Sequence, residues 1–180
     1  MADYFLHTVI QQPIPVADMT PLERLVLEAM FQSDVIDDTI YFYHEQGPSD
    51  MIWLTREDLA AAFAVSPQDG ALGDLVAASI LTAPPNNSEI EIDLSAISWE
   101  CILQDIVKRS TTLRYLTVVK SYNCSSMRAD GFGGLAVIVT PTGIKGKSTD
   151  DILEEFVGEI ESQLRATTAL PTQEAHHEHP

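Results

Sequence analysis

Apolar side chains recur along this chain with two periods, one of two residues and one of three to four. The shorter period, together with runs of aromatic and β-branched residues, predicts β-strands. Acidic and aliphatic residues alternate in residues 89–94, so Ile90, Ile92 and Leu94 are expected to face inward. Turn residues between residues 39–44 and 51–54 predict that these two segments form a hairpin. The predicted strands are residues 4–11, 39–44, 51–54, 89–94, 113–122 and 134–140.

The longer period predicts amphipathic helices whose first residues are good caps. Thr20, Pro21 and Glu23 form a helix start of the capping-box type, and this helix is expected to end near Asp34. Thr55, Ser98 and either Ser148 or Thr149 are the expected caps of later helices. The apolar stripe of the last helix consists of Ile152, Leu153, Phe156, Val157, Ile160 and Leu164. The predicted helices cover residues 20–34, 55–64, 69–81, 98–109 and a segment that begins at 148 or 149.

The order of these elements predicts an α+β fold, with a mostly antiparallel sheet packed against four to five helices. Residues 1–166 are expected to form a single domain, with an acidic part over 1–107 and a near-neutral part over 108–166. Residues 167–180 show no apolar period, which predicts a disordered tail.

Residues 53–94 resemble a winged helix-turn-helix, with a short capped helix, a second helix and a strand after it. In a DNA-binding protein of this kind, the second helix presents basic or amide side chains to the major groove. Residues 66–81 contain Asp69, Asp74 and neither Lys nor Arg. Because carboxylates oppose binding to phosphates, we expect the shape here without direct contact to nucleic acid.

Charge is the least ordinary property of the sequence. The 180 residues contain 10 basic and 27 acidic side chains, for a net charge of −17. Residues 1–107 hold 18 acids and two bases, a net charge of −16, whereas residues 108–180 hold nine acids and eight bases. An imbalance of this kind favours basic partners and disfavours nucleic acid or anionic surfaces. Acidity that serves solubility alone is the alternative explanation.

Composition narrows the class of protein further. Hydrophobic residues make up 45% of the chain, which is enough for a core. No apolar run reaches the roughly 18 residues of a membrane span, so no membrane contact is expected. The first residues show no basic segment followed by a cleavage site, and two cysteines do not make a disulfide framework. A reduced, cytoplasmic protein is therefore the expectation.

The stretch CSSMRADGFGG, residues 124–134, looks most like a chemical site. Its glycines precede a strand rather than a helix, which argues against a phosphate-binding loop. A nucleophilic Cys124 would need His7 or His44 as base and Asp130 to orient it, and the sequence does not indicate that they meet. We expect a buried Cys124, a glycine-containing hairpin, and a loop contact made by Arg128 and Asp130. No catalytic residue is assigned.

Three segments, ILQDIVKRS, CSSMRADGFGGLAVIVT and KSTDDILEE, resemble parts of an uncharacterised family of small proteins. Members of that family are encoded on plasmids and other mobile elements of Gram-negative bacteria. The resemblance covers roughly residues 99–157 and is most specific in the pattern M-R-x-D-G-F-G-G, residues 127–134. The resemblance implies a mobile-element context and supplies no activity and no catalytic residue.

Other candidate sites have ordinary explanations. Three carboxylates in residues 34–38 could attract a hard cation, but the spacing of a calcium loop is missing, and a solvated helix end is preferred. The histidines of residues 176–179 form a loose tract without defined ligand spacing. Trp53 and Trp99 lie in core-like contexts. We therefore predict no metal and no cofactor.

The sequence leads to a leading hypothesis and an alternative. The leading one is a non-enzymatic module that docks on a basic, nucleic-acid-binding host protein by imitating phosphate charge. The alternative is a structural or homo-oligomerisation domain whose acidity serves solubility only. A cysteine-dependent enzyme and a winged-helix regulator are the remaining classes. The carboxylates proposed to bind the partner are Asp34, Asp37, Asp38, Glu45, Asp50, Glu57, Asp58, Asp69 and Asp74.

Overall fold

A computed structural model describes residues 3–67, 70–128 and 130–168, and its architecture is α+β, as the sequence predicts. The strands are β1 (Tyr4–Ile10), β2 (Ile14–Pro15), β3 (Gln32–Ile36), β4 (Thr39–His44), β5 (Met51–Thr55), β6 (Glu89–Asp93), β7 (Leu116–Cys124), β8 (Phe132–Thr140) and β9 (Gly143–Ser148). The helices are α1 (Pro21–Met30), α2 (Arg56–Val65), α3 (Ala71–Thr82), α4 (Trp99–Arg109) and α5 (Thr149–Thr168), with a 3-10 turn η1 (Val16–Asp18).

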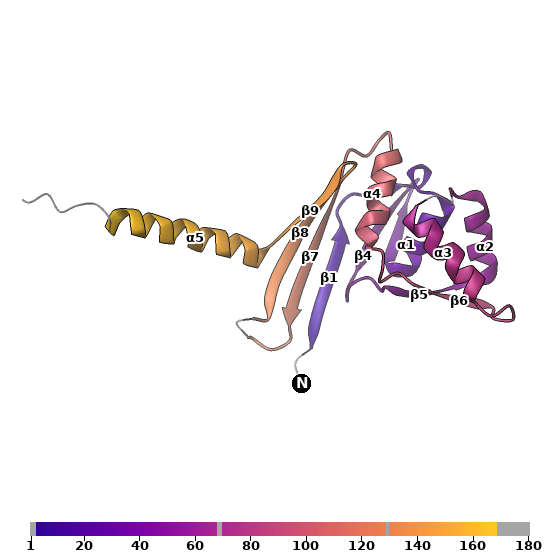
Figure 1. Ribbon diagram of the computed structural model, residues 1–180, viewed down its shortest axis with the longest axis horizontal. Coiled ribbons are helices and arrows are strands. Elements are labelled where there is room, and N and C mark those ends of the chain that lie inside the picture. The colour runs from indigo at the N-terminus through magenta and orange to yellow at the C-terminus, as the bar shows by residue number, and fades with distance from the viewer. Residues whose placement is uncertain (1–2, 68–69, 129, 169–180) are drawn as a thin grey trace, which may run out of the picture.

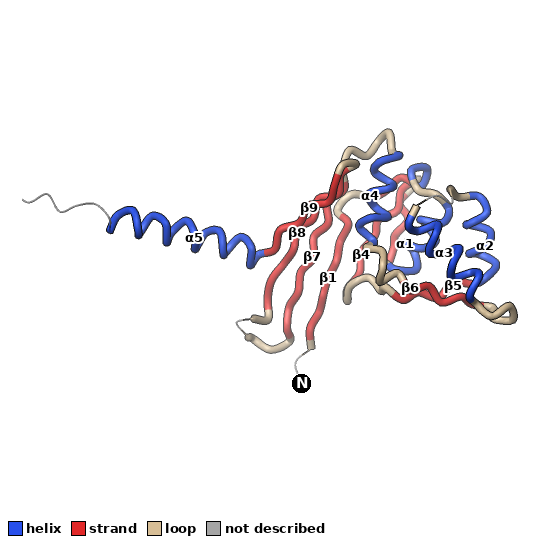
Figure 2. Tube along the Cα trace, in the orientation of Figure 1, coloured by secondary structure: helices blue, strands red, loops and turns tan. Residues whose placement is uncertain are grey.

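Two antiparallel sheets organise the molecule (Figures 1 and 2). The larger has seven strands, with β2-β4-β1-β7-β8-β9 in sequence across it and β3 paired to β4. The smaller is a ribbon of β5 and β6 that lies beside α2 and α3. Helix α1 joins the two sheets, because it packs on β3, β5 and α2, whereas α4 packs on β8 and β9 of the large sheet.

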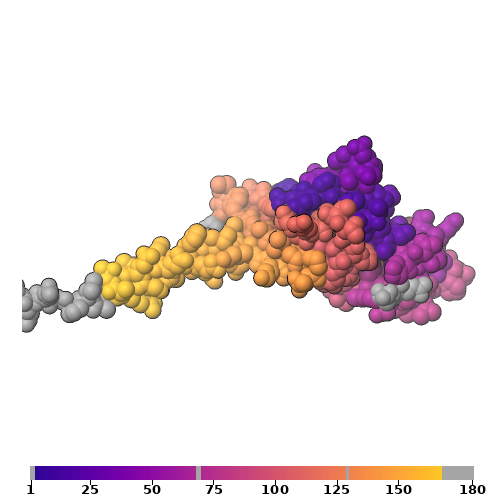
Figure 3. Space-filling view, turned by 90° about the horizontal axis from the view of Figure 1, so that it is seen from above, coloured from indigo at the N-terminus to yellow at the C-terminus, as the bar shows by residue number. Residues whose placement is uncertain are grey.

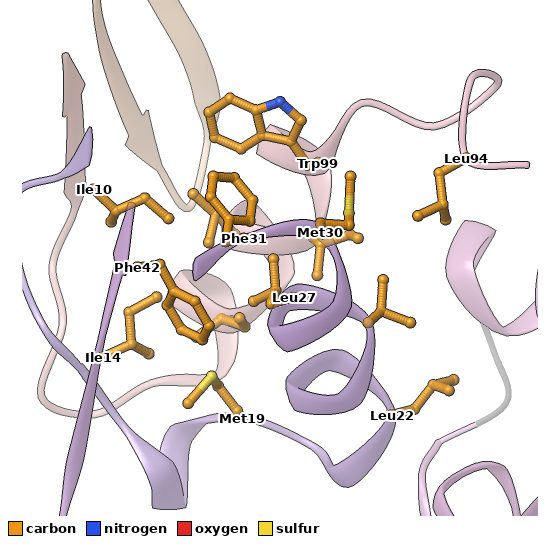
Figure 4. Close-up of a cluster of buried hydrophobic side chains, with 14 of the residues drawn as sticks. Ile10, Ile14, Met19, Leu22, Leu27, Met30, Phe31, Phe42, Leu94 and Trp99 are labelled. Atoms are coloured by element: carbon orange, nitrogen blue, oxygen red, sulfur yellow. The ribbon is translucent and has the colours of Figure 1, made fainter. Parts of the chain in front are cut away.

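One continuous core connects both sheets to helices α1 to α4, and Figure 4 shows a part of it. Phe42 of β4 and Leu27 of α1 are completely buried in it. The ring of Phe31 stands edge-on to Phe42, with 6.2 Å between centroids, and to Trp99, with 5.3 Å between centroids. Above Trp99 lies the ammonium of Lys120, 4.5 Å from the ring centroid. These edge-to-face contacts fix the start of α4 against the end of α1.

The first helix begins as predicted and ends earlier than predicted. The Thr20 hydroxyl accepts a hydrogen bond from the Glu23 backbone N–H at 3.2 Å, and the Glu23 carboxylate accepts one from the Thr20 N–H at 2.9 Å, which confirms the capping box. The prediction that this helix reaches Asp34 is wrong, because α1 ends at Met30. The residues that follow pair along β4 as strand β3, so residues 34–38 form a strand and a turn instead of a helix end.

The predicted hairpin between residues 39–44 and 51–54 is also wrong. Both segments are strands, but β4 lies in the large sheet while β5 pairs with β6, more than thirty residues later in the chain. Ile52 and Leu54 of β5 face the core together with Ile90 and Ile92 of β6. The common apolar face of these two strands covers α2 and α3, and burial of that face explains the pairing.

Helix α5 stands apart from the rest of the molecule (Figures 1 and 3). It begins where the edge strand β9 ends and leads away from the sheet, and its side chains are exposed along its length. The predicted apolar stripe therefore exists but is not part of the core: Phe156 is 54% exposed and Ile160 is 56% exposed. The helix passes the predicted domain boundary at residue 166, and the predicted disordered tail lies mostly outside the described residues.

Candidate functional site

The carboxylates predicted to bind a partner occupy separate parts of the structure. Asp34 lies on β3, and Asp37 and Asp38 form the β3–β4 turn, with Asp37 at a positive φ of 53°. Glu45 follows the far end of β4, so a strand roughly 20 Å long separates it from that turn. Asp50, Glu57, Asp58 and Asp74 lie with the ribbon, α2 and α3, and Asp69 is outside the described residues.

The outer face of the β5–β6 ribbon is the most concentrated of these acidic surfaces. Its strands alternate between buried and exposed residues, and Glu89, Glu91 and Asp93 of β6 all point to solvent. Across the ribbon, Trp53 lies directly opposite Glu91, and Thr55 lies opposite Glu89. The indole of Trp53 is 58% exposed. A large aromatic ring therefore lies at the surface among three carboxylates.

Arg56 is the only Lys or Arg between residues 25 and 107, and it does not neutralise these carboxylates. Its Nε donates a hydrogen bond to the carbonyl oxygen of Asn87 at 3.1 Å, and its Nη2 donates to the carbonyl oxygen of Pro84 at 2.7 Å. The guanidinium thus holds the loop between α3 and β6 by its backbone. The ion pairs found in the described part of the chain all lie outside residues 51–93.

Two shallow hollows flank this loop. One, of about 390 Å³, is lined by Trp53, Glu89, Glu91 and residues 86–88. The other, of about 690 Å³, is lined by residues 55–58, Ala60 and residues 87–89. Glu89 belongs to both hollows, so they form one continuous surface with the outer face of the β5–β6 ribbon. We call this surface the ribbon face and define it as Trp53, Glu57, Asp58, Glu89, Glu91 and Asp93.

Hydrogen bonds keep the negative charge of the ribbon face in place. The Asp93 carboxylate accepts hydrogen bonds from the Ser95 hydroxyl and from the Ser95 backbone N–H, the latter at 2.9 Å, and these hydrogen bonds hold the pKa of Asp93 below its usual value. Asp58 accepts a hydrogen bond from the Thr55 hydroxyl at 2.7 Å, while its own N–H donates to the same hydroxyl at 3.1 Å. Glu57 and Asp58 also lie in the first turn of α2, where a negative charge is favourable.

The prediction that Trp53 lies in a core-like context is wrong, whereas Trp99 is buried as expected. Sequence reasoning also left Glu89, Glu91 and Asp93 out of the predicted partner-binding set. The alternation in residues 89–94 was a sufficient signal that these carboxylates face outward. Placing Trp53 beside them required the correct partner strand, because Ile52 and Leu54 must face inward on the same ribbon.

The glycine stretch forms the hairpin that the sequence predicts, but its later glycines belong to strand β8. Arg128 pairs with Asp130 at 3.4 Å, and both side chains are exposed. Cys124 is buried, with 4% of its surface exposed. His7 lies opposite Ser121, so it projects from the other face of the sheet than Cys124, and His44 lies opposite Thr8, a further strand away. The structure therefore brings neither His7 nor His44 to Cys124.

A third hollow, of about 300 Å³ between α1, α3 and α4, contains charges of both signs, and these are paired with one another. Arg109 forms an ion pair with the buried Glu23, and Lys108 forms one with Asp105 at 2.9 Å. In the part of the chain that the structure describes, no group of three His, Cys, Asp or Glu side chains is arranged to hold a metal ion. The histidines of residues 176–179 lie outside that part.

A survey of the helices and comparisons with known proteins complete the description. Among the helices of the described residues, none combines the length and apolar character needed to cross a lipid bilayer. No family model matches the chain, and neither a curated protein nor a solved structure matches it. The ribbon face therefore has to be interpreted from its own geometry.

Proposed function

We propose that this protein is a non-enzymatic interaction module that docks on a basic protein surface through its ribbon face. The observation that carries the proposal is the position of Trp53, which is exposed directly opposite Glu91 in a surface whose nearby base, Arg56, is bonded to backbone carbonyls of the α3–β6 loop. A buried Trp would need no partner. An exposed indole among carboxylates suits an Arg or Lys side chain, which gains a cation–π contact and a charge pair together.

The spacing of the carboxylates supports a partner that normally binds nucleic acid. Alternate residues of a strand lie about 6.8 Å apart, so Glu89, Glu91 and Asp93 form a straight row of negative charges. Such a row imitates a run of phosphates and attracts a basic surface over a distance, with an on-rate that falls as salt rises. The resemblance of residues 99–157 to mobile-element proteins supports a host protein as that partner.

The binding test uses an arginine-rich peptide as the probe and the full chain as the receptor. Trp53 is exposed and Trp99 is buried, so quenching of the exposed indole reports occupancy of the ribbon face. We expect the peptide to quench the fluorescence at low salt, and moderate salt to weaken binding. Calorimetric titration, which does not depend on the Trp53 fluorescence, compares the variants: Trp53→Ala and Glu91→Gln should each weaken binding by about tenfold, because both remove part of one contact.

The matched control is Asp37→Asn, which removes the same charge from the β3–β4 turn. Asn tolerates the positive φ of 53° at this position, so the fold is preserved. Binding should change little in this variant. Equal losses for Asp37→Asn and Glu91→Gln would show that the peptide responds only to the overall charge of −17, and the proposed site would be wrong.

A competition experiment tests the imitation of phosphate. A basic DNA-binding protein held on a labelled duplex should be released by the wild-type chain and not by Trp53→Ala. Release by both proteins to the same extent would argue for general acidity. No release by either would contradict the docking proposal.

A further inference from the structure

Helix α5 presents an apolar stripe to solvent. Ile152, Leu153, Phe156, Val157 and Ile160 fall on one side of the helix and are between 37% and 59% exposed. A helix with such a stripe normally draws most of its stability from burying it against a neighbour. The described part of the chain covers only the beginning of α5, where the helix meets β8 and β9.

Local contacts prevent α5 from folding back over its own sheet. β9 ends at Ser148 and α5 begins at Thr149, so no linker separates them. The Ser148 N–H donates to the Asp151 carboxylate at 2.7 Å, and the Gly134 N–H donates to the Thr149 hydroxyl at 3.2 Å. Lys147 also forms an ion pair with Glu155. These contacts direct the helix away from the sheet edge (Figure 1).

The large sheet has a second uncovered apolar surface, on the face opposite α4. Val119 lies beside Ala136, and Thr117 lies beside Ile138, with Lys147 and Lys145 at the outer end of the two rows. Val119 is 42% exposed and Ile138 is 37% exposed. A hollow of about 430 Å³ lies over these residues, with an apolar floor and the two lysines along one side. We call this surface the open sheet face.

Charge makes the helix and the open sheet face complementary. Strands β1, β7, β8 and β9 contain no Asp or Glu, and two of their three lysines, Lys145 and Lys147, project from the open sheet face. Helix α5 contains six acids and Arg165 as its single base. At 100° per residue, Glu159 and Glu161 lie on either side of the apolar stripe. Lys145, for which no carboxylate partner is found within the described residues, is positioned to meet such a flank.

We propose that α5 of one copy lies on the open sheet face of a second copy, and the reverse, in a two-fold dimer. The two surfaces belong to the same chain, so a two-fold axis satisfies both with one type of contact made twice. Their lengths agree, because a 20-residue helix and a nine-residue strand each extend about 30 Å. Exclusion of water from the stripe and the hollow stabilises the contact, and the flanking charges set its direction.

Sedimentation of the full chain tests the proposal. The wild-type protein should be a dimer, and Phe156→Glu on the helix and Ile138→Glu on the sheet should each yield monomers. Both positions are exposed, and Glu is a good helix former, so circular dichroism should remain native. Leu81→Glu is the matched control, because Leu81 is 84% exposed on α3 and should leave the dimer intact.

Mixing the two monomeric variants separates this dimer from other arrangements. The Ile138→Glu copy keeps a wild-type helix and the Phe156→Glu copy keeps a wild-type sheet face, so together they can restore one of the two contacts. A heterodimer should therefore reappear on mixing. A wild-type monomer would overturn the proposal. Loss of the dimer only in Phe156→Glu, with no heterodimer on mixing, would overturn it in favour of pairing between two α5 helices.

The dimer and the ribbon-face function are independent in these tests. Trp53→Ala should stay dimeric, and Ile138→Glu should still bind the arginine-rich peptide. The ribbon lies at the end of the molecule opposite to α5, so neither variant reaches the other surface (Figure 1).

Discussion

Gly133 on β8 lies directly opposite Tyr122 on β7, and the ring of Tyr122 occupies the space that a side chain at 133 would need. A Cβ atom on Gly133 would come within 2.0 Å of the Tyr122 phenol. The same phenol donates a hydrogen bond to Asp150 in the first turn of α5 at 3.4 Å. The missing side chain at 133 therefore lets Tyr122 connect the sheet to the start of α5.

Gly133→Ala should displace Tyr122 and destabilise the protein by about 1–3 kcal/mol, as overpacking does elsewhere. Urea unfolding measures the change in the free energy of unfolding. Gly143→Ala is the control, because a Cβ atom there would meet nothing within 4 Å. A Gly133→Ala protein as stable as Gly143→Ala would show that the Tyr122 ring moves aside without cost.

The ion pair between Arg109 and Glu23 should contribute more to stability than the ion pair between Lys108 and Asp105 on α4. Glu23 is 5% exposed, so Arg109→Met leaves a buried carboxylate without its cation and should lower the free energy of unfolding by about 2–3 kcal/mol. Lys108→Met removes a pair whose partners are both nearly half exposed, and should cost about 0.5 kcal/mol. Chemical denaturation compares the two. Equal effects would mean that water reaches Glu23 in the folded protein.

The stability of the first turn of α5 should depend on pH through the ionisation of Asp151. Hydrogen bonds from the Ser148 N–H and hydroxyl hold the pKa of Asp151 below its ordinary 3.8. A carboxyl with a lowered folded-state pKa contributes stability that is present above pH 3.8 and is lost as the pH falls through the folded pKa. The helical signal of α5 should therefore weaken only in strong acid.

Ser148→Ala should raise the pKa of Asp151 toward 3.8 because the hydroxyl donor is removed. An NMR titration of the carboxyl carbons follows this shift. The pKa of Asp93, which is lowered by Ser95, should stay unchanged in the same spectra and serves as the internal control. An unchanged titration of Asp151 would contradict the role of Ser148 as the cap of α5.

The two thiols should differ in reactivity. Cys101 is exposed on α4 and Cys124 is buried at the end of β7, so a thiol reagent should label Cys101 rapidly in the folded protein and Cys124 only after unfolding. Mass spectrometry of the Cys101→Ser protein isolates the slow thiol. Labelling of Cys124 in the native state as fast as that of Cys101 would revive a cysteine-dependent activity.

Local sequence predicted most elements of the fold, because the signals for them are themselves local. The capping residues of α1, α2 and α4 lie where the sequence places them, since a cap needs only a polar side chain two or three residues from its donor. Strands β2, β3 and β9 were missed. β2 has only two residues, and β3 and β9 are polar strands at the edges of the sheet whose residues show little apolar alternation.

The local pattern does not determine which strand β5 pairs with. Residues 39–44 and 51–54 satisfy every local criterion for a hairpin, yet β5 pairs with β6 across two intervening helices. Burial of Ile52 and Leu54 together with Ile90 and Ile92 decides this register. That register in turn places Trp53 beside Glu91, which is the centre of the candidate site.

The sequence by itself determined the kinds of element, their caps and the uneven distribution of acidic residues, because each follows from neighbouring residues or from simple counting. Only the tertiary structure decided which apolar sides are covered. The stripe of α5 and the indole of Trp53 resemble core residues in the sequence, and both are exposed. Periodicity shows that one side of an element is apolar, whereas its burial depends on which distant segments the chain brings against it.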